Sequence, residues 1–299
     1  MTRVLVVGDI VTDVLAVYSG PLSAGSDTPA RILVTPGGSA ANTATWLARA
    51  GCPACFVGVV GDDPAGAQRL SELAAAGVDC AVRQEPGAVT GSVVVLSRYQ
   101  ERTMLCDRGA NARLSTSDID RAMAGSAGAV HLHLSGYALF DGESRTAGRH
   151  ALATAASRGL TTSVDAASAG PLQRVGGPAF LDWVRGVDLL LANLDEARAL
   201  VPGTVDRAGP PETLARLLAG YAKHAVVKLG AGGAVWATGE AVSRVPAQPA
   251  RLVDPTGAGD AFAAGLLAAW CTGASPADAL RAGARLGALA VETLGGRPG

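Results

Sequence analysis

A glycine-rich loop followed at once by an apolar run is the feature that most constrains this chain. The loop reads Asp254-Pro255-Thr256-Gly257-Ala258-Gly259-Asp260, and small residues at three successive positions let a ligand approach the backbone. The run Ala261 to Trp270 is long enough for a helix and apolar on all sides, so this helix should be buried. The unpaired amides and the positive dipole end at its N-terminus predict an anion site of the kind used for phosphate.

Asp260 at the end of this loop is unusual, because a carboxylate repels a phosphate. It makes sense if it contacts another group, such as a hydroxyl that attacks the phosphorus. The alternative is a plain helix cap, but capping does not require the segment Gly257-Ala258-Gly259. The joint occurrence of loop and acid favours the functional interpretation. The helix dipole should favour the ionised carboxylate and make it a weaker base, so we expect positioning to matter more than base strength.

Composition indicates a large globular protein. The 299 residues are 48% hydrophobic and 17% charged, which is enough to bury a sizeable core. A net charge of -1 gives no basic surface for nucleic acid and no charge run for a membrane. The apolar start of the chain reads as a first strand and not as a signal peptide, so we expect a soluble, cytoplasmic protein. Five cysteines fit reduced thiols, and we expect Cys52 and Cys55 to be buried and not a redox pair.

The order of apolar segments predicts an α/β fold. Val4 to Val7 is a continuous apolar run, typical of a strand buried on both faces. Strands and helices then alternate, which predicts a mostly parallel central sheet covered by helices. The strands are expected at 56–60, 129–134, 162–164, 189–192 and on both sides of the glycine turn in 226–236, and the helices at 39–50, 64–76 and 144–157.

Four short β-branched segments predict a second, smaller sheet. They are 15–18, 31–34, 91–96 and 103–106. We expect one domain over residues 1–299, with these strands lying within about 14–36 and 90–107. The exposed face of such a sheet could pair with a second copy, so the sequence leaves open a homodimer.

Several polar residues stand where strands should end or helices begin. Asp9 and Asp13 follow the first strand, and acids at the carboxyl ends of parallel strands are site candidates. A solvated turn explains Asp13 equally well. Gly38 lets the backbone approach a ligand, and Asn42 can donate to and accept from a polyol. The same segment also fits a plain turn with Ser39 as the N-cap.

Two further segments allow both a structural and a functional interpretation. Asn193 and Glu196 have the spacing of a capping box, which occurs without any function. The segment from Val226 to Trp236 reads as a strand, a glycine turn and a strand. It is not a P-loop, since no Gly-Lys-Ser or Gly-Lys-Thr follows. His131 and His133 alternate on one strand without a third ligand of suitable spacing, so we expect no metal there.

Two of these segments together carry a family resemblance. Gly37-Gly38-Ser39-Ala40-Ala41-Asn42-Thr43-Ala44 resembles the N-terminal signature of the ribokinase-like carbohydrate and nucleoside kinases, also called the phosphofructokinase B family. The segment from Asp254 to Phe262 resembles their C-terminal signature. Weaker matches between them extend the resemblance over nearly the whole chain. It implies a ribokinase-like three-layer α/β/α fold in which the small β-sheet is a lid over the substrate.

The resemblance also implies a role for each matching residue. The catalytic group consists of Asp260 as the base and the amides of Gly257, Ala258 and Gly259 as the anion hole. The substrate hydroxyls are implied to bind to Asp13, Gly38 and Asn42. The nucleotide, ATP, is implied to lie near Asn193, Lys228, Gly230 and Gly233. Glu196 matches a position near Mg²⁺, reached through water, and Asp254 a position beside a monovalent cation such as K⁺.

The acceptor stays open between a sugar or sugar-like molecule and a nucleoside. Ribose-specific relatives typically carry a polar residue and a lysine where this chain has Val11 and Ser39, which argues against ribose. A nucleoside base could stack on an aromatic side chain, and the candidates are Tyr18, Tyr99, Tyr137 and Phe140. Arg98 or Arg102 in the lid could favour an acidic or phosphorylated sugar. A binding protein that kept the fold and lost the chemistry is the third alternative.

Overall fold

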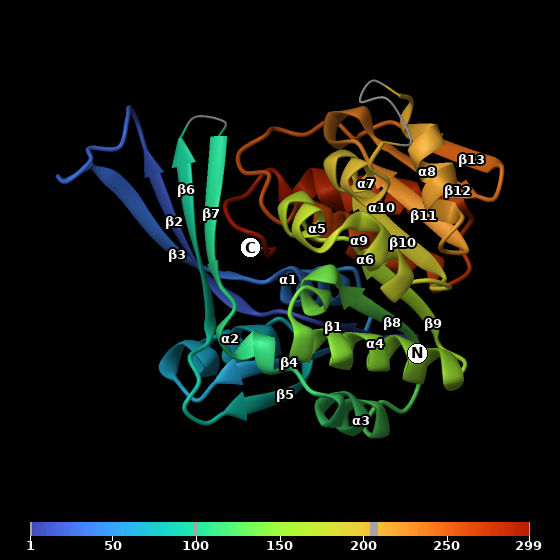
Figure 1. Cartoon of the computed structure of the whole chain (residues 1–299), viewed down its shortest axis with the longest axis horizontal. Coiled ribbons are helices and arrows are strands. Elements are labelled where there is room, and N and C mark those ends of the chain that lie inside the picture. The colour runs from blue at the N-terminus through green and yellow to red at the C-terminus, as the bar shows by residue number, and fades with distance from the viewer. Residues whose placement is uncertain (1, 99–100, 204–208, 299) are drawn as a thin grey trace.

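The chain forms two β-sheets in the computed structural model, which describes residues 2–98, 101–203 and 209–298. The large sheet has nine strands in the order β13-β12-β11-β10-β9-β8-β1-β4-β5, and the small one has four in the order β3-β2-β6-β7. The seven neighbouring strands from β11 to β5 in this order run parallel, whereas β12 is antiparallel to β11 and β13 is antiparallel to β12. The predicted α/β class with a mostly parallel sheet and a small lid sheet is confirmed (Figure 1).

The strands of the large sheet are β1 (Arg3–Val7), β4 (Ala54–Gly61), β5 (Asp79–Glu85), β8 (Ala129–Ser135), β9 (Thr161–Asp165), β10 (Leu189–Asn193), β11 (His224–Lys228), β12 (Ala234–Thr238) and β13 (Ala241–Val245). The strands of the lid are β2 (Val11–Tyr18), β3 (Ala30–Gly37), β6 (Gly91–Arg98) and β7 (Glu101–Asp107). The helices are α1 (Ser39–Arg49), α2 (Pro64–Ala75), α3 (Thr116–Ala124), α4 (Gly142–Ser157), α5 (Ala169–Val175), α6 (Gly177–Trp183), α7 (Leu194–Leu200), α8 (Pro211–Ala219), α9 (Ala258–Trp270) and α10 (Pro276–Ala290).

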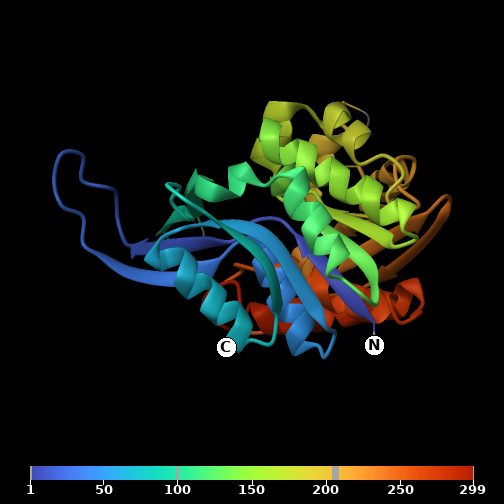
Figure 2. The same ribbon diagram turned by 90° about the horizontal axis from the view of Figure 1, so that it is seen from below.

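Successive residues of β1 face two different helix layers, because side chains alternate along a strand. Leu5 and Val7 belong to a buried cluster with helices α3 to α8. Val4 and Val6 belong to a second cluster with α1, α2, α9 and α10. The sheet is therefore the middle of three layers, which Figures 1 and 2 show from two directions. The apolar helix predicted from the sequence is α9, and most of it is buried between the sheet and α10.

Parallel strands bring polar residues from distant parts of the sequence to one edge of the large sheet. Asp9 follows β1, Asp165 ends β9, Asn193 ends β10 and Lys228 ends β11. The register pairs Asn193 with Lys228 across the two neighbouring strands. The small sheet rises beside this edge (Figure 1), and the two sheets together enclose the site described below.

Two cysteines of the sequence analysis lie outside this edge. Cys52 and Cys55 are buried and free, as predicted, and burial raises the pKa of both thiols. In the part of the chain that the structure describes, no helix combines the length and the apolar character needed to cross a bilayer.

The buried side chain of Asn111 joins the two ends of the lid to each other. Its Oδ1 accepts a hydrogen bond from the amide of Ile10 at 2.9 Å, just before β2. Its Nδ2 donates to the carbonyl of Ile10 at 2.9 Å and to that of Arg108 at 3.0 Å, just after β7. A Cβ on Gly91, the first residue of β6, would lie 2.4 Å from this Nδ2, so only glycine fits there. Asn111 therefore fixes the base of the lid.

Replacing Asn111 by alanine should lower the free energy of unfolding by about 2–4 kcal/mol, because it leaves the buried amide and the buried carbonyl of Ile10 without their side-chain partner. Urea denaturation of the two proteins measures the difference. The matched control is Gln68→Ala, which removes an exposed amide that donates to Glu72, and it should change the free energy by less than about 0.5 kcal/mol. Equal losses in the two variants would contradict the assigned role of Asn111.

Candidate active site

Helix α9 begins at the predicted anion loop, three residues earlier than the apolar run suggests. Its N-cap is Gly257, whose φ of 74° lies in the left-handed region. A Cβ there would lie 2.4 Å from the carbonyl oxygen of Gly296, so the position requires glycine. Among the amides of the loop and the first helical turn, that of Ala258 donates to the carbonyl of Pro255 at 3.3 Å, whereas those of Gly257 and Gly259 have no carbonyl of a preceding turn to bond with. They are available to an anion at the mouth of the helix.

Asp260 lies in the first turn of α9 and is held by two neutral donors from α1. Ser39 Oγ donates to its Oδ1 at 2.8 Å, and Asn42 Nδ2 donates to its Oδ2 at 2.9 Å. The carboxylate is partly accessible from the cleft but is densely surrounded by protein. Burial raises the pKa of Asp260 to about 7, although the two hydrogen bonds lower it. The prediction that the helix dipole makes it a weaker base is wrong, because desolvation outweighs every lowering effect.

Helix α1 starts at Ser39, but Ser39 does not cap it. Gly38 occupies the N-cap position with a φ of 97°. Because it is a glycine, it has no side chain that could cap the helix. The amide of Ser39 instead donates to Asp9 Oδ2 at 3.0 Å, and Ser135 Oγ donates to Asp9 Oδ1 at 3.1 Å. The alternative of a plain turn with Ser39 as cap is therefore wrong. The Ser39 hydroxyl is free of that role and bonds to Asp260.

Asp13 lies on the first lid strand, β2, and lines the cleft. Burial, followed by the charge of Asp9, raises the pKa of Asp13 to about 6. Gly37 on the neighbouring strand has no room for a side chain, since a Cβ there would lie 2.3 Å from Asp13 Oδ2. Gly37 thus packs tightly against the Asp13 carboxylate, and a Cβ on Gly38 would lie 2.5 Å from the backbone carbonyl oxygen of Asp9.

A buried ion pair lies on the other side of the anion loop. Lys228 Nζ donates to Asp165 Oδ2 at 2.5 Å, and a Cβ on Gly259 would lie 3.3 Å from the same Nζ. Burial disfavours the lysine cation, but Asp165 and Glu196 outweigh this and raise the pKa of Lys228. A positive charge therefore stands directly beside the loop that is expected to bind phosphate.

The predicted capping box at the start of α7 is confirmed. Asn193 Oδ1 accepts a hydrogen bond from the amide of Glu196 at 2.9 Å, and Glu196 Oε2 accepts one from the amide of Asn193 at 2.7 Å. Both residues also line the cleft. Burial raises the pKa of Glu196 to about 7, although Lys228 lowers it. The capping role therefore coexists with a position in the site.

The turn between β11 and β12 brings two glycines to the same cleft. A Cβ on Gly233, whose φ is 86°, would lie 2.0 Å from the carbonyl oxygen of Val245. Gly230 has a φ of 55° and open space around it. Gly233 is thus required by the backbone, while Gly230 leaves room for a ligand.

One cleft of about 760 Å³ collects almost all of the predicted site residues. It is lined by Asp13, Gly38, Asn42, Asn193, Glu196, Lys228, Gly230, Gly233, Gly257, Ala258, Gly259 and Asp260. Asp254 lies outside the lining. Its Oδ1 accepts from the amide of Thr256 at 2.8 Å and its Oδ2 from that of Gly295 at 3.0 Å, so it ties the loop to the C-terminal segment.

Sequence reasoning missed Asp165 and Ala167, which also line the cleft. Asp165 ends a predicted strand, and the argument that selected Asp9 and Asp13 could have selected it. Ala167 has a φ of 70°, which is rare for a residue with a side chain. Its amide donates to Asp165 Oδ1 at 3.0 Å. The strained turn therefore holds the carboxylate that pairs with Lys228.

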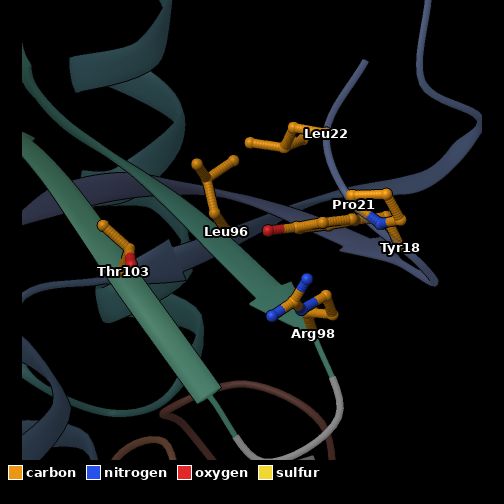
Figure 3. A pocket seen from close by; sticks show the side chains of 6 residues that line it. All are labelled: Tyr18, Pro21, Leu22, Leu96, Arg98 and Thr103. Carbon is orange, nitrogen blue, oxygen red and sulfur yellow. The ribbon is translucent and has the colours of Figure 1, made fainter. Parts of the chain in front are cut away.

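The predicted aromatic candidates are distributed over different places. Tyr137 lines the cleft, whereas Phe140 packs against the ring of Phe180. Tyr18 and Arg98 line a separate hollow of about 220 Å³ at the end of the lid, together with Pro21, Leu22, Leu96 and Thr103 (Figure 3). Tyr99 and the side chain of Arg102 lie outside the described residues.

The two histidines of β8 have structural partners. His131 Nε2 and His133 Nδ1 both lie within hydrogen-bonding distance of Ser163 Oγ, at 2.7 and 2.8 Å. Burial lowers the pKa of His131 to about 3 and that of His133 to about 4, so both are neutral. Within the described ranges, no three His, Cys, Asp or Glu side chains gather as a metal site would require.

Comparison with known proteins agrees with this geometry. A family model of the pfkB family carbohydrate kinases matches residues 1–299. An ATP-dependent ribose-1-phosphate kinase of Halopiger xanaduensis is 32% identical over 301 residues, covering 99% of this chain and 94% of that protein. A fructokinase of Klebsiella pneumoniae is 34% identical over 275 residues, covering 89% and 83%. The crystal structure of adenosine kinase from Sinorhizobium meliloti has a TM-score of 0.87 at 27% identity, covering 99% and 96%. The chain belongs to the pfkB family and is a carbohydrate kinase with a ribokinase-like fold.

Proposed function

We propose that the protein transfers the γ-phosphoryl group of ATP to a hydroxyl group of a sugar or sugar-like molecule. The observation that carries this proposal is the position of Asp260. Its carboxylate is held by Ser39 and Asn42 at the same helix mouth as the amides of Gly257 to Gly259. A base for the incoming alcohol and an anion site for the phosphoryl group are thus adjacent.

In the proposed transfer, each part of this arrangement has one role. Asp13, Gly38 and Asn42 would bind the acceptor and aim one hydroxyl at the phosphorus. As the bond between that oxygen and the phosphorus forms, the bond to ADP breaks and Asp260 accepts the hydroxyl proton. The amides at the start of α9 would stabilise the charge on the phosphoryl oxygens. A pKa of about 7 for Asp260 suits a base that works near neutral pH.

The nucleotide would occupy the side of the cleft that carries Lys228. Lys228 and the backbone near Gly230 and Gly233 face that side. Glu196 fits the position of a group that holds Mg²⁺ through water, because it is a buried carboxylate at the cleft and its nearest cation is already paired with Asp165. Mg²⁺ bound there would neutralise phosphate charge, and it commonly takes few protein ligands when phosphates and water supply the others.

The acceptor class rests on the groups around Asp260. Asp13 and Asn42 line this part of the cleft and suit the hydroxyl groups of a polyol. Arg108 also lines the cleft, where its Nε lies 3.0 Å from Asp141 Oδ2 and its guanidinium lies over the ring of Tyr137. Tyr137 favours a second candidate, a nucleoside whose base stacks on the ring; a structural relative is an adenosine kinase.

We also propose that the protein forms a homodimer through the lid and that it works in the cytoplasm. Ile32 and Val34 on β3 are 56% and 64% exposed, and a second lid sheet would cover them. A kinase that draws on ATP and small metabolites suits the cytoplasm.

Asp260→Asn should reduce turnover by several orders of magnitude while substrate binding is largely retained, because the base acts mainly in the transition state. ADP release is measured for both proteins over a panel of sugars, sugar acids, sugar phosphates and nucleosides. A substrate-dependent signal that disappears in the variant supports the kinase. Tight binding of a panel member by the native protein without ADP release indicates a sensor, and near-normal turnover of the variant excludes Asp260 as the base.

Asp260 should have opposite effects on activity and on stability as the pH rises. Turnover should increase with pH and level off above about pH 7, where the base is ionised. Because the pKa is raised in the folded state, the contribution of Asp260 to stability is full below its unfolded pKa and is lost as pH rises to about 7. Asp260→Asn should therefore be more stable than the native protein at pH 8 by on the order of 2 kcal/mol, and this gain should vanish near pH 4. Denaturant unfolding at both pH values checks this, and a gain that does not vary with pH would contradict it.

Potassium should raise the turnover relative to sodium or choline at equal ionic strength. Asp254 holds the loop before α9 against the C-terminal segment, and a cation bound by carbonyl oxygens between them would stabilise the loop in the form that binds phosphate. Initial rates in the three chloride salts measure the effect. Equal rates would count against a cation site at Asp254 and leave the role of Asp260 unaffected.

A further inference from the structure

The C-terminal segment from Gly295 to Arg297 lies against the start of α1. Trp46 Nε1 donates to the carbonyl of Gly296 at 3.0 Å, and the amide of Gly295 donates to Asp254. A Cβ on Gly296 would lie 2.4 Å from Asn42 Nδ2, so glycine is needed for this close approach. The side chain of Arg297 is only 7% exposed. A charged residue is thus buried next to the substrate-binding helix, and the mechanism above does not use it.

Arg297 bonds to the opposite side of the same amide that holds Asp260. Its Nε donates to Asn42 Oδ1 at 3.3 Å, and its Nη2 donates to the carbonyl of Gly37 at 3.0 Å. Asn42 Nδ2 donates to Asp260 Oδ2 at 2.9 Å. An asparagine amide has an acceptor on one side and a donor on the other. If it were turned over, its amino group would face a guanidinium and its oxygen would face a carboxylate.

Two carboxylates, those of Glu72 and Asp13, act on Arg297 through their charges and raise its pKa, although burial lowers it more. Glu72 lies 3.8 Å from its Nη1, and Glu72 already pairs with Arg69 at 2.8 Å. Burial lowers the pKa of Arg297 to about 10, so it is still charged at neutral pH. Its shortest contacts are therefore the two bonds to the glycine-rich turn and to Asn42. A guanidinium always donates and never accepts, which makes it suited to fixing the orientation of an amide.

We propose that Arg297 is a positioning residue of the kinase site: it fixes the Asn42 amide so that its amino group holds the Asp260 carboxylate toward the acceptor hydroxyl. The inference rests on the proposed function, in which Asp260 is the base. It adds a residue from the end of the described chain that touches neither substrate nor phosphate in the mechanism and acts through Asn42 alone.

A double-mutant cycle on turnover tests this dependence. Asn42→Ala removes one hydrogen bond to a charged group, so kcat should fall by about tenfold to hundredfold. Arg297→Met should cause part of the same loss. In the Asn42→Ala background, Arg297→Met should have no further effect on kcat, because the arginine has nothing left to orient. Losses that multiply in the double variant would overturn the proposal.

The ionisation of Asp260 gives a second readout that does not require activity. The other groups that face this carboxylate are Ser39, Asp165, Lys228 and the neutral Tyr137, and all stay in place in the variants. Carboxyl carbon NMR, assigned with Asp260→Asn, should show a higher pKa for Asp260 in Arg297→Met than in the native protein, because one stabilising donor loses its orientation. An unchanged pKa would overturn the proposal. If the native protein forms no ADP with any acceptor, the proposed function fails, and the NMR comparison still decides the role of Arg297.

The matched control is Arg69→Met, which removes another buried guanidinium beside Glu72. Arg69 is 2% exposed and donates to Glu72. This variant should lower the free energy of unfolding and leave the pKa of Asp260 unchanged. A shift as large as that of Arg297→Met would mean that any loss of buried charge suffices, and would overturn the proposal. Should Arg297→Met fail to fold, Arg297→Lys keeps the charge, lacks the planar fork and enters the same cycle with the same expected outcome.

Discussion

The site depends on one carboxylate that is removed from water without a cation in contact with it. Asp260 is held by a hydroxyl and an amide, Ser39 and Asn42, and not by a salt bridge. Neutral donors fix the direction of the carboxylate but compensate its lost hydration only in part. This is why its pKa rises to about 7 although it stands at the positive end of a helix. The same lack of compensation that would suit Asp260 to the proposed role of base makes its ionised form costly to the fold.

The charges around this carboxylate are arranged in two groups. On the acceptor side, Asp13 and Asp9 lie close together, and the pKa of Asp13 is raised to about 6. On the nucleotide side, Asp165 holds Lys228 against the anion loop, so a cation is present where phosphate is expected. The acidic side suits hydroxyl groups, and the cationic side suits phosphate. The polarity of the cleft thus follows the direction of the proposed transfer.

The lid completes the acceptor side with apolar surface. Val93, Val95, Met104 and Cys106 line the cleft from β6 and β7, and side chains of these strands that point the other way face solvent. Asn111 joins the two chain segments that enter and leave the lid. The lid is therefore a separate sheet, and Asn111 fixes the place where its first and last strands join the rest of the chain.

The two glycine-containing segments could be recognised from the sequence because each has a local physical cause. Gly257 requires a left-handed backbone at the entrance of an apolar helix, and Gly37-Gly38 allows close packing against Asp9 and Asp13. The strongly apolar strands β1, β4 and β10 were predicted from continuous apolar runs, and the helices α1, α2 and α4 from their alternation with such strands. β13 was not predicted, because it is a short edge strand that is mostly exposed and has little apolar pattern.

By itself, the sequence determined the α/β class, the buried helix α9 and the glycine-rich loop with its acid, since these depend on nearest neighbours along the chain, and the family resemblance added the candidates for acceptor binding. The tertiary structure alone decided which groups surround each candidate. The pKa of Asp260 depends on desolvation by elements far away in sequence, the Lys228–Asp165 pair depends on strand order, and the Arg297–Asn42 contact joins residues from opposite ends of the chain. Burial and long-range contact are properties of the packed molecule, and no local pattern encodes them.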